Sequence, residues 1–177
     1  MARLLGGTEG WLETTPPPYL KIKIKYERMT TMSKLYLAYG SNLNRQQMAV
    51  RCPTAKVVGT TFLEGYKLLF RGPHAGAVAT VEPSKDDKVP VMIWEIQDRD
   101  EAALDIYEGY PRLYTKETVK VKLGRKNEEV MMYVMTEGRP LNLPSAYYYG
   151  TILHGYKGAK FDKKFLDDGV ERSRTTA

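Results

Sequence analysis

The chain contains 177 residues, of which 42% are hydrophobic and 27% charged, and its formal net charge is +6. This composition is typical of one globular domain with a core of its own, and no apolar run approaches the roughly 18 residues of a transmembrane helix. A single cysteine excludes an internal disulfide, and with only two histidines the chain lacks the usual metal ligands. We therefore expect neither a metal site nor a membrane partner.

The basic charge is spread along the chain rather than gathered in one stripe. Lysines and arginines are interleaved with acids, as in Lys160–Lys164 and the acidic residues that follow it, and no recognised nucleic-acid motif is present. We expect a solvated surface of mixed charge and no nucleic-acid partner; a basic, nucleic-acid-associated domain is the alternative. The lone Cys52 is expected to be reduced, which indicates cytoplasmic localisation.

Residues 1–31 differ from the rest of the chain. The stretch TTPPPY at 14–19 cannot continue a helix or a central strand, and no apolar segment of a signal peptide follows Arg3. Met32 opens a natural start for a domain, and codons for Glu27–Met29 can contain a purine-rich ribosome-binding sequence. Our hypothesis is that this segment is upstream DNA of a bacterial gene translated from an early start. A real but flexible extension is the alternative.

The first half of the domain begins with a strand-like run at 35–39, which breaks at Gly40. A short helix over 44–51 follows, with Asn44 as its N-cap. Apolar, β-branched runs separated by turn residues at 64–65 and 83–87 then predict four strands, at 56–63, 66–71, 75–81 and 89–96.

The second half opens with a helix that Asp98 caps, with Glu101 completing a capping box, and that ends near Tyr107 before Gly109. Two alternating runs at 114–123 and 128–135 form a hairpin, a helix follows Pro144 and continues until Gly155, and a last short helix covers 161–168.

Six or seven strands against three helices, with mostly short connections, predict an α+β domain around a strongly curved sheet or small barrel. We expect this domain to span 32–170 and to be followed by a frayed tail at 171–177.

The first candidate site is the corner Gly40-Ser41-Asn42, between the first strand and the first helix. A tight corner of this kind leaves backbone N–H groups unpaired and directed at one spot, which suits an anion. The same composition is common in ordinary turns. A Ser41 nucleophile would require His74 or His154 as its base, and neither has a sequence context for that role.

The second candidate is Glu108. Helical spacing places Leu104 and Tyr107 on the face that packs on the sheet, and it directs Glu101 and Asp105 to solvent. Glu108 falls on the border of the apolar face, where partial desolvation raises a carboxyl pKa towards that of a neutral-pH general base. The alternative is a plain surface acid, although the helix dipole disfavours negative charge at a C-terminus.

Together these motifs resemble the gamma-glutamyl cyclotransferase-like family, in a small bacterial-type member. The resemblance covers nearly all of residues 34–158 and rests on four landmarks in order: Tyr-Gly-Ser-Asn-Leu at 39–43, Gly-x-x-Ala-Thr at 76–80, Glu-Gly at 108–109 and Pro-Ser-x-x-Tyr at 144–148.

The resemblance implies a small mixed barrel without a cofactor, acting on a small-molecule gamma-glutamyl substrate. The α-amine of the substrate attacks its own γ-glutamyl amide and releases 5-oxoproline with an amine or amino acid. Glu108 carries over as the catalytic acid/base and Tyr148 as a hydroxyl near the substrate. The loop that holds the glutamyl end carries over as Tyr39, Gly40, Ser41, Asn42 and Leu43. A non-catalytic member that binds a small carboxylate ligand is the alternative; an acid against an apolar face favours the enzyme.

Overall fold

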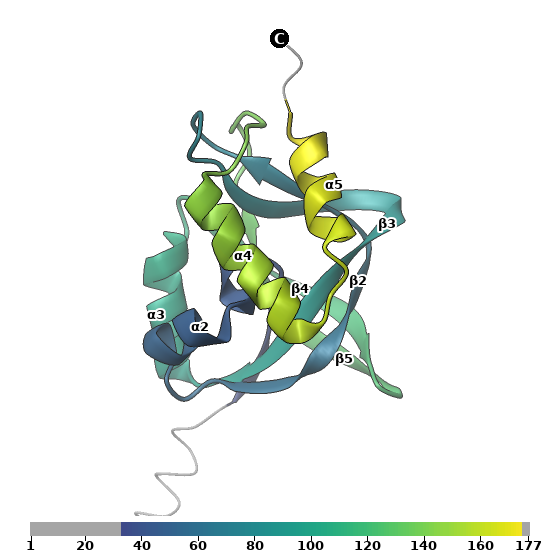
Figure 1. Cartoon of the computed structure of the whole chain (residues 1–177). Helices are drawn as coiled ribbons and strands as arrows, with labels where there is room; N and C mark the ends of the chain where they lie inside the picture. The colour runs from purple at the N-terminus through teal and green to yellow at the C-terminus, as the bar shows by residue number, and fades with distance from the viewer. Residues whose placement is uncertain (1–32, 175–177) are drawn as a thin grey trace, which may run out of the picture. The chain divides into compact units, whose positions relative to one another are not determined.

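The structure is a computed structural model that describes residues 33–174. This part of the chain forms an α+β unit with one five-stranded sheet, four α-helices and a short 3-10 helix, η1, which confirms the predicted class (Figure 1). The strands are β1 (Lys34–Ala38), β2 (Lys56–Arg71), β3 (Val78–Ile96), β4 (Tyr114–Leu123) and β5 (Lys126–Met135). The helices are η1 (Ser41–Leu43), α2 (Arg45–Arg51), α3 (Asp98–Glu108), α4 (Ala146–Ala159) and α5 (Lys164–Arg172). The interpretation of residues 1–31 lies outside the described residues.

The short strand β1 is the centre of the sheet, whose order is β2-β3-β1-β5-β4. It pairs antiparallel with β3 and parallel with β5. Both neighbours continue past its end at Ala38, where the chain leaves the sheet and turns into η1. The corner predicted at Gly40 therefore lies between two strands that extend beyond it.

The predicted turns at 64–65 and 83–87 are wrong, because β2 and β3 are each one long strand rather than two. Gly65 has a φ of +77° at a register shift between Glu64 and Tyr66, so a bulge bends β2 without reversing it. Pairing resumes on both sides, with Tyr66 opposite Pro83 and Glu64 opposite Lys88. Pairing of the two strands on both sides of this irregularity overrides the local turn composition.

The four α-helices lie where helical segments were expected, one more than the predicted total of three, and three boundaries differ. The N-cap of α3 is Gln97 rather than Asp98, because Asp100 is buried, accepts from Gln97 N–H at 3.0 Å and bonds Thr54 at 2.6 Å. The C-terminal stop at Gly109 is confirmed, with the residue in the left-handed region.

Helix α4 begins after its N-cap Ser145 and continues through Gly155, the predicted end, to Ala159. Gly155 stays in the helix because it permits close packing: a Cβ there would lie 2.5 Å from Leu43 Cβ. Helix α5 extends through Arg172, past the predicted end at 168 and into the expected frayed tail. Ser173 is buried and accepts a hydrogen bond from Phe70 N–H at 2.7 Å, which holds this end of the chain.

The core lies between the sheet and α4. Leu37, Ile93 and Met132, from three adjacent strands, are fully buried together with Ile152 and Tyr156 of α4. Helix α4 also packs on η1, and α5 packs on β2 (Figure 1). The loop after β1, which contains η1, is thus held in place by its contacts with α4. No helix within residues 33–174 is long and apolar enough to cross a membrane.

Candidate active site

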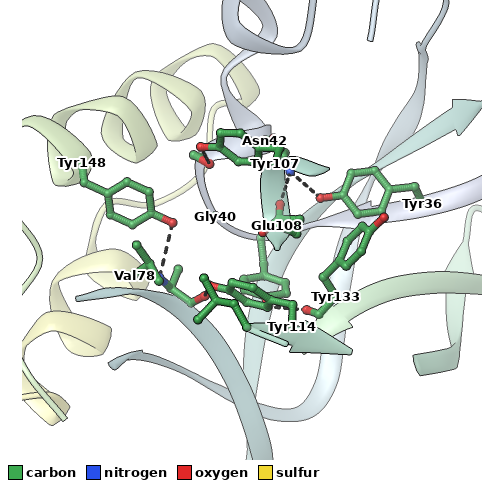
Figure 2. Close-up of a pocket in the computed structure, with 13 residues that line it drawn as sticks. Tyr36, Gly40, Asn42, Val78, Tyr107, Glu108, Tyr114, Tyr133 and Tyr148 are labelled. Atoms are coloured by element: carbon green, nitrogen blue, oxygen red, sulfur yellow. Dashed lines mark hydrogen bonds between the residues drawn. The ribbon is translucent and has the colours of Figure 1, made fainter. Parts of the chain in front are cut away.

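A pocket of about 250 Å³ opens where β1 ends. Figure 2 shows tyrosines from several strands and helices pointing into it around the Glu108 carboxyl group. Its walls are Tyr36, Tyr39, Gly40, Ser41, Asn42, Val78, Ala79, Tyr107, Glu108, Leu113, Tyr114, Tyr133 and Tyr148. The two candidate sites of the sequence, the loop after β1 and the end of α3, therefore meet in one cavity.

Glu108 is the last residue of α3 and is partly buried. Its Oε1 accepts a hydrogen bond from Asn42 Nδ2 at 2.8 Å. Burial raises the pKa of the Glu108 carboxyl to about 7, although the Asn42 hydrogen bond and the positive charge of Arg51 both act to lower it. At neutral pH this group is present in both protonation states, as a residue must be that accepts and returns a proton.

The side chain of Asn42 links three elements. Its Nδ2 also donates to the Tyr36 hydroxyl on β1 at 2.7 Å, and its Oδ1 accepts a short hydrogen bond from Arg51 at the end of α2. Figure 2 shows the two bonds that Nδ2 donates, to Glu108 and Tyr36. The predicted loop residue is thus the direct partner of the predicted acid.

The loop around Gly40 keeps some of its backbone donors free. Leu43 N–H donates to Gly40 O at 3.0 Å, but the N–H groups of Ser41 and Asn42 have no acceptor among residues 33–174. Ser41 Oγ is 3.0 Å from the Tyr107 hydroxyl. A Cβ at Gly40 would lie 3.3 Å from Ala79 Cβ, so glycine allows the loop to approach β3 closely.

Leu43 does not line the pocket. Its side chain is fully buried in the core and its N–H closes the first turn of η1, so neither group is free for a ligand. The free donors therefore include the N–H groups of Ser41 and Asn42 but not that of Leu43, where the sequence suggested the whole corner. Leu43 holds the loop in place by packing against Gly155 of α4.

Tyr148 projects from α4 towards β3, and its hydroxyl accepts a hydrogen bond from Ala79 N–H at 3.3 Å (Figure 2). Tyr39 lines the wall but donates its hydroxyl proton to Tyr133 O at 2.5 Å. Burial raises the pKa of both phenols far above neutral, so both are uncharged. Apart from Glu108, the pocket wall is consequently polar but electrically neutral.

Neither histidine lines the pocket, and both are exposed. Ser41 has no base beside it, so the serine hydrolase alternative has no geometric support. Cys52 is buried, and burial raises the pKa of its thiol to about 11, which disfavours a nucleophilic thiolate. Residues 33–174 contain no cluster of His, Cys, Asp or Glu that could hold a metal ion.

Several wall residues were absent from the sequence prediction. Tyr36, Tyr114 and Tyr133 come from three strands, and the chain's 13 tyrosines gave no means of choosing them. Tyr107 was expected to pack on the sheet but is 44% exposed, with its ring under Arg51 and its hydroxyl at Ser41.

Comparison with known proteins decides the family. A model of the family described as "Gamma-glutamyl cyclotransferase, AIG2-like" matches residues 36–151, which include every residue of the pocket wall. The chain belongs to this family. The gamma-glutamylcyclotransferase of Homo sapiens is 32% identical to it over 136 residues, covering 71% of each chain.

Other relatives agree with this assignment. The Bos taurus gamma-glutamylcyclotransferase is 33% identical over 84 residues, a match that spans 44% of this chain and 45% of that protein. A solved structure described as a gamma-glutamyl cyclotransferase has a TM-score of 0.67 at 28% identity and covers 77% of this chain and 86% of its own. The solved structure thus shares the fold over most of this chain.

Proposed function

We propose that the protein is a cyclotransferase that cleaves a γ-glutamyl amide by intramolecular attack of the substrate's α-amine. The products are 5-oxoproline and a free amine or amino acid. One observation carries this proposal: a carboxyl group with a pKa of about 7, Glu108, faces a neutral pocket beside unpaired backbone N–H groups. Membership of the family supports the same reaction class.

The loop after β1 would hold the substrate. A γ-glutamyl group carries an α-carboxylate, and the N–H groups of Ser41 and Asn42 are donors suited to it. Anchoring this end folds the substrate so that its amine approaches the γ-carbonyl carbon. Positioning of this kind contributes on the order of 7–11 kcal/mol in favourable intramolecular reactions. Binding geometry would therefore supply most of the rate enhancement.

Glu108 would transfer the proton. As a carboxylate it removes a proton from the α-ammonium, and the resulting amine attacks the γ-carbonyl to form the ring C–N bond. The protonated carboxyl then gives that proton to the departing nitrogen as the original amide bond breaks. Glu108 next carries a second proton from the ring nitrogen, which becomes the lactam N–H, to the released amine, which leaves as an ammonium ion. Atoms balance without water, and one residue performs both steps.

The neutral wall serves the same chemistry. The proton of the Tyr148 hydroxyl is available to a substrate oxygen, because its oxygen already accepts from Ala79 N–H. Phenols that stay uncharged do not compete with Glu108 for the proton. The buried, unpaired Cys52 suits a reducing compartment, and we propose the cytoplasm as the site of the reaction.

The test is release of 5-oxoproline from a panel of γ-glutamyl amines and γ-glutamyl amino acids by wild type and Glu108→Gln. We expect release by the wild type and a loss of two to four decades of turnover in the variant, the usual range for a general acid/base. Glu64→Gln, an exposed glutamate on β2, is the matched control and should retain activity. Equal activity of wild type and a folded Glu108→Gln would refute the assignment.

A further inference from the structure

Arg51 reaches the site from outside the pocket wall. It is the last residue of α2, and its guanidinium carbon lies 3.3 Å from the centre of the Tyr107 ring. Its Nη1 donates a short hydrogen bond to Asn42 Oδ1. Stacking and hydrogen bonding together fix this guanidinium in one place.

The Asn42 amide could in principle face its neighbours in either of two orientations. A guanidinium has donors and no acceptor, so the group that faces Arg51 must be the amide oxygen. The amide nitrogen then points the other way, and its two protons go to Tyr36 at 2.7 Å and Glu108 at 2.8 Å. The reversed amide would set oxygen against the Glu108 carboxylate and nitrogen against the guanidinium. Both contacts would be repulsive.

We propose that Arg51 is a positioning residue for Glu108, acting through Asn42: its guanidinium orients the amide so that the nitrogen, not the oxygen, faces the carboxyl group. The assignment rests on the proposed function, since it gives Glu108 the role of proton carrier. Arg51 is not itself part of the pocket wall and acts through a residue that is.

The other titratable groups around Glu108 do not supply a competing charge. The phenols that face it from β1, the following loop, β4, β5 and α4 all have a raised pKa and are neutral: Tyr36, Tyr39, Tyr114, Tyr133 and Tyr148. Tyr107 of α3 bonds Ser41, and Asp105 forms its own ion pair with Lys116 at 2.7 Å. Among the described residues, Arg51 is the cation whose charge acts to lower the pKa of Glu108, and its guanidinium bonds an amide rather than an acid.

Loss of Arg51 should therefore shift the ionisation of Glu108 in a known direction. The amide is freed to turn its oxygen towards the carboxylate, and a positive charge is removed. Both changes disfavour the ionised form, so the pKa of Glu108 should rise from about 7. We expect a rise of roughly one unit, which lowers the ionised fraction at pH 6 about tenfold.

The experiment is a carbon-13 NMR titration of the protein labelled at the glutamate carboxyl carbon. The Glu108 signal is identified by its absence in Glu108→Gln. Arg51→Gln should move its inflection upward by roughly one unit, and Arg51→Lys, which keeps a charge and a donor, by roughly half as much. Arg45→Gln is the matched control, because Arg45 is exposed at the other end of α2. It should leave the inflection unchanged.

An unchanged inflection in folded Arg51→Gln would overturn the proposal, as would an equal shift in Arg45→Gln. If Arg51→Gln does not fold, Arg51→Lys decides, and an inflection equal to that of wild type overturns the proposal. The titration needs no substrate, so it stands even if the chain turns over no γ-glutamyl compound. Where turnover is found, the acid limb of kcat/KM should move with the NMR inflection while KM changes little.

Discussion

The two ends of α3 carry glutamates in opposite surroundings. Glu101, in the first turn, bonds Lys34 at 2.5 Å and Lys116 at 2.6 Å. Burial acts to raise the pKa of Glu101, but these lysines outweigh it and hold the pKa below its usual range. Glu108, at the other end, meets an amide and neutral phenols, and its pKa rises to about 7. The same side chain on the same helix is a structural anion at one end and, in the proposed mechanism, a proton carrier at the other.

The difference teaches that burial alone does not make an acid reactive. Both glutamates are partly buried, and what separates them is the charge of the groups they face. Two lysines neutralise Glu101 directly, whereas the guanidinium near Glu108 is bound to Asn42 rather than to the carboxyl group. An acid that is desolvated and only indirectly paired keeps a pKa near neutral.

The largest expected effect separates the two glutamates by activity. Glu108→Gln should lose about two to four decades of kcat with KM within a few-fold, because the proton carrier is removed and the binding loop is kept. Glu101→Gln should retain activity within about twofold, since it serves α3 and not the pocket. Both are measured by 5-oxoproline release at pH 7.5. Comparable losses of activity in both variants would show that the two glutamates do not differ in role.

The second prediction tests whether the activity that depends on Glu108 requires Asn42 to be held in its present position. In Gly155→Ala the new Cβ would lie 2.5 Å from Leu43 Cβ and 2.7 Å from the Leu43 carbonyl carbon, so η1 must shift. We expect a loss of about 1–3 kcal/mol in the free energy of unfolding, as for other overpacked sites, together with reduced activity. Urea denaturation measures the first and the cyclotransferase assay the second.

Gly158→Ala in the same helix is its control. Nothing lies within 4 Å of a Cβ at Gly158, so this variant should be more stable than wild type by about 0.5–1 kcal/mol. If Gly155→Ala behaved like its control, the close packing of α4 on η1 would not be needed to hold Asn42.

The third prediction concerns the dependence of stability on pH. The pKa of Glu108 in the folded state, about 7, lies above the ordinary value of 4.5, so the folded state binds this proton more tightly. The resulting stability is fully present below pH 4.5 and is lost as the pH rises to 7. Glu108→Gln avoids this loss and should be more stable than wild type by about 3 kcal/mol at pH 8.

At pH 4.5, an ordinary glutamate's pKa, the two proteins should differ far less. Urea denaturation at both pH values measures this change. An advantage of the same size at both would mean that ionisation of Glu108 costs the fold nothing.

The smallest expected effect is on stability and concerns Glu101, the glutamate of α3 that is paired with two lysines. Glu101→Gln removes the partner of two lysines, and we expect a loss of about 1 kcal/mol in the free energy of unfolding. The Glu101 side chain is only 15% exposed, which places the loss near the upper end for such pairs. Denaturation in low and high salt checks it, because screening should reduce the difference from wild type. A loss that salt leaves unchanged would indicate packing rather than charge.

Some of the site was predictable from local sequence. The break after β1 at Gly40, the cap at Asn44 and the acid at the border of an apolar face all depend on neighbours within a few residues. The hairpin of β4 and β5 followed from alternation, although its turn is tighter than predicted, with Leu123 paired to Lys126. Such features are set by backbone preferences and helical periodicity.

The assignment of Glu101 and Asp105 to solvent was wrong, and the reason is instructive. Glu101, Asp105 and Glu108 recur at helical spacing on one side of α3, and that side meets lysines and tyrosines of β1, β4 and β5. Periodicity marks which residues share a face. It does not say whether a face of charged residues meets water or a complementary surface.

By itself the sequence determined the α+β class, the loop after the first strand, the acid at the end of α3 and the family resemblance. Each of these depends on residues close together in the chain. Only the tertiary structure decided that Asn42 bonds Glu108, that Arg51 bonds Asn42, and that tyrosines from five helices and strands surround them. It also showed that the four strands predicted between residues 56 and 96 are two long strands, β2 and β3. These contacts link residues far apart in the sequence, and their energies depend on burial and on partners that local composition does not specify.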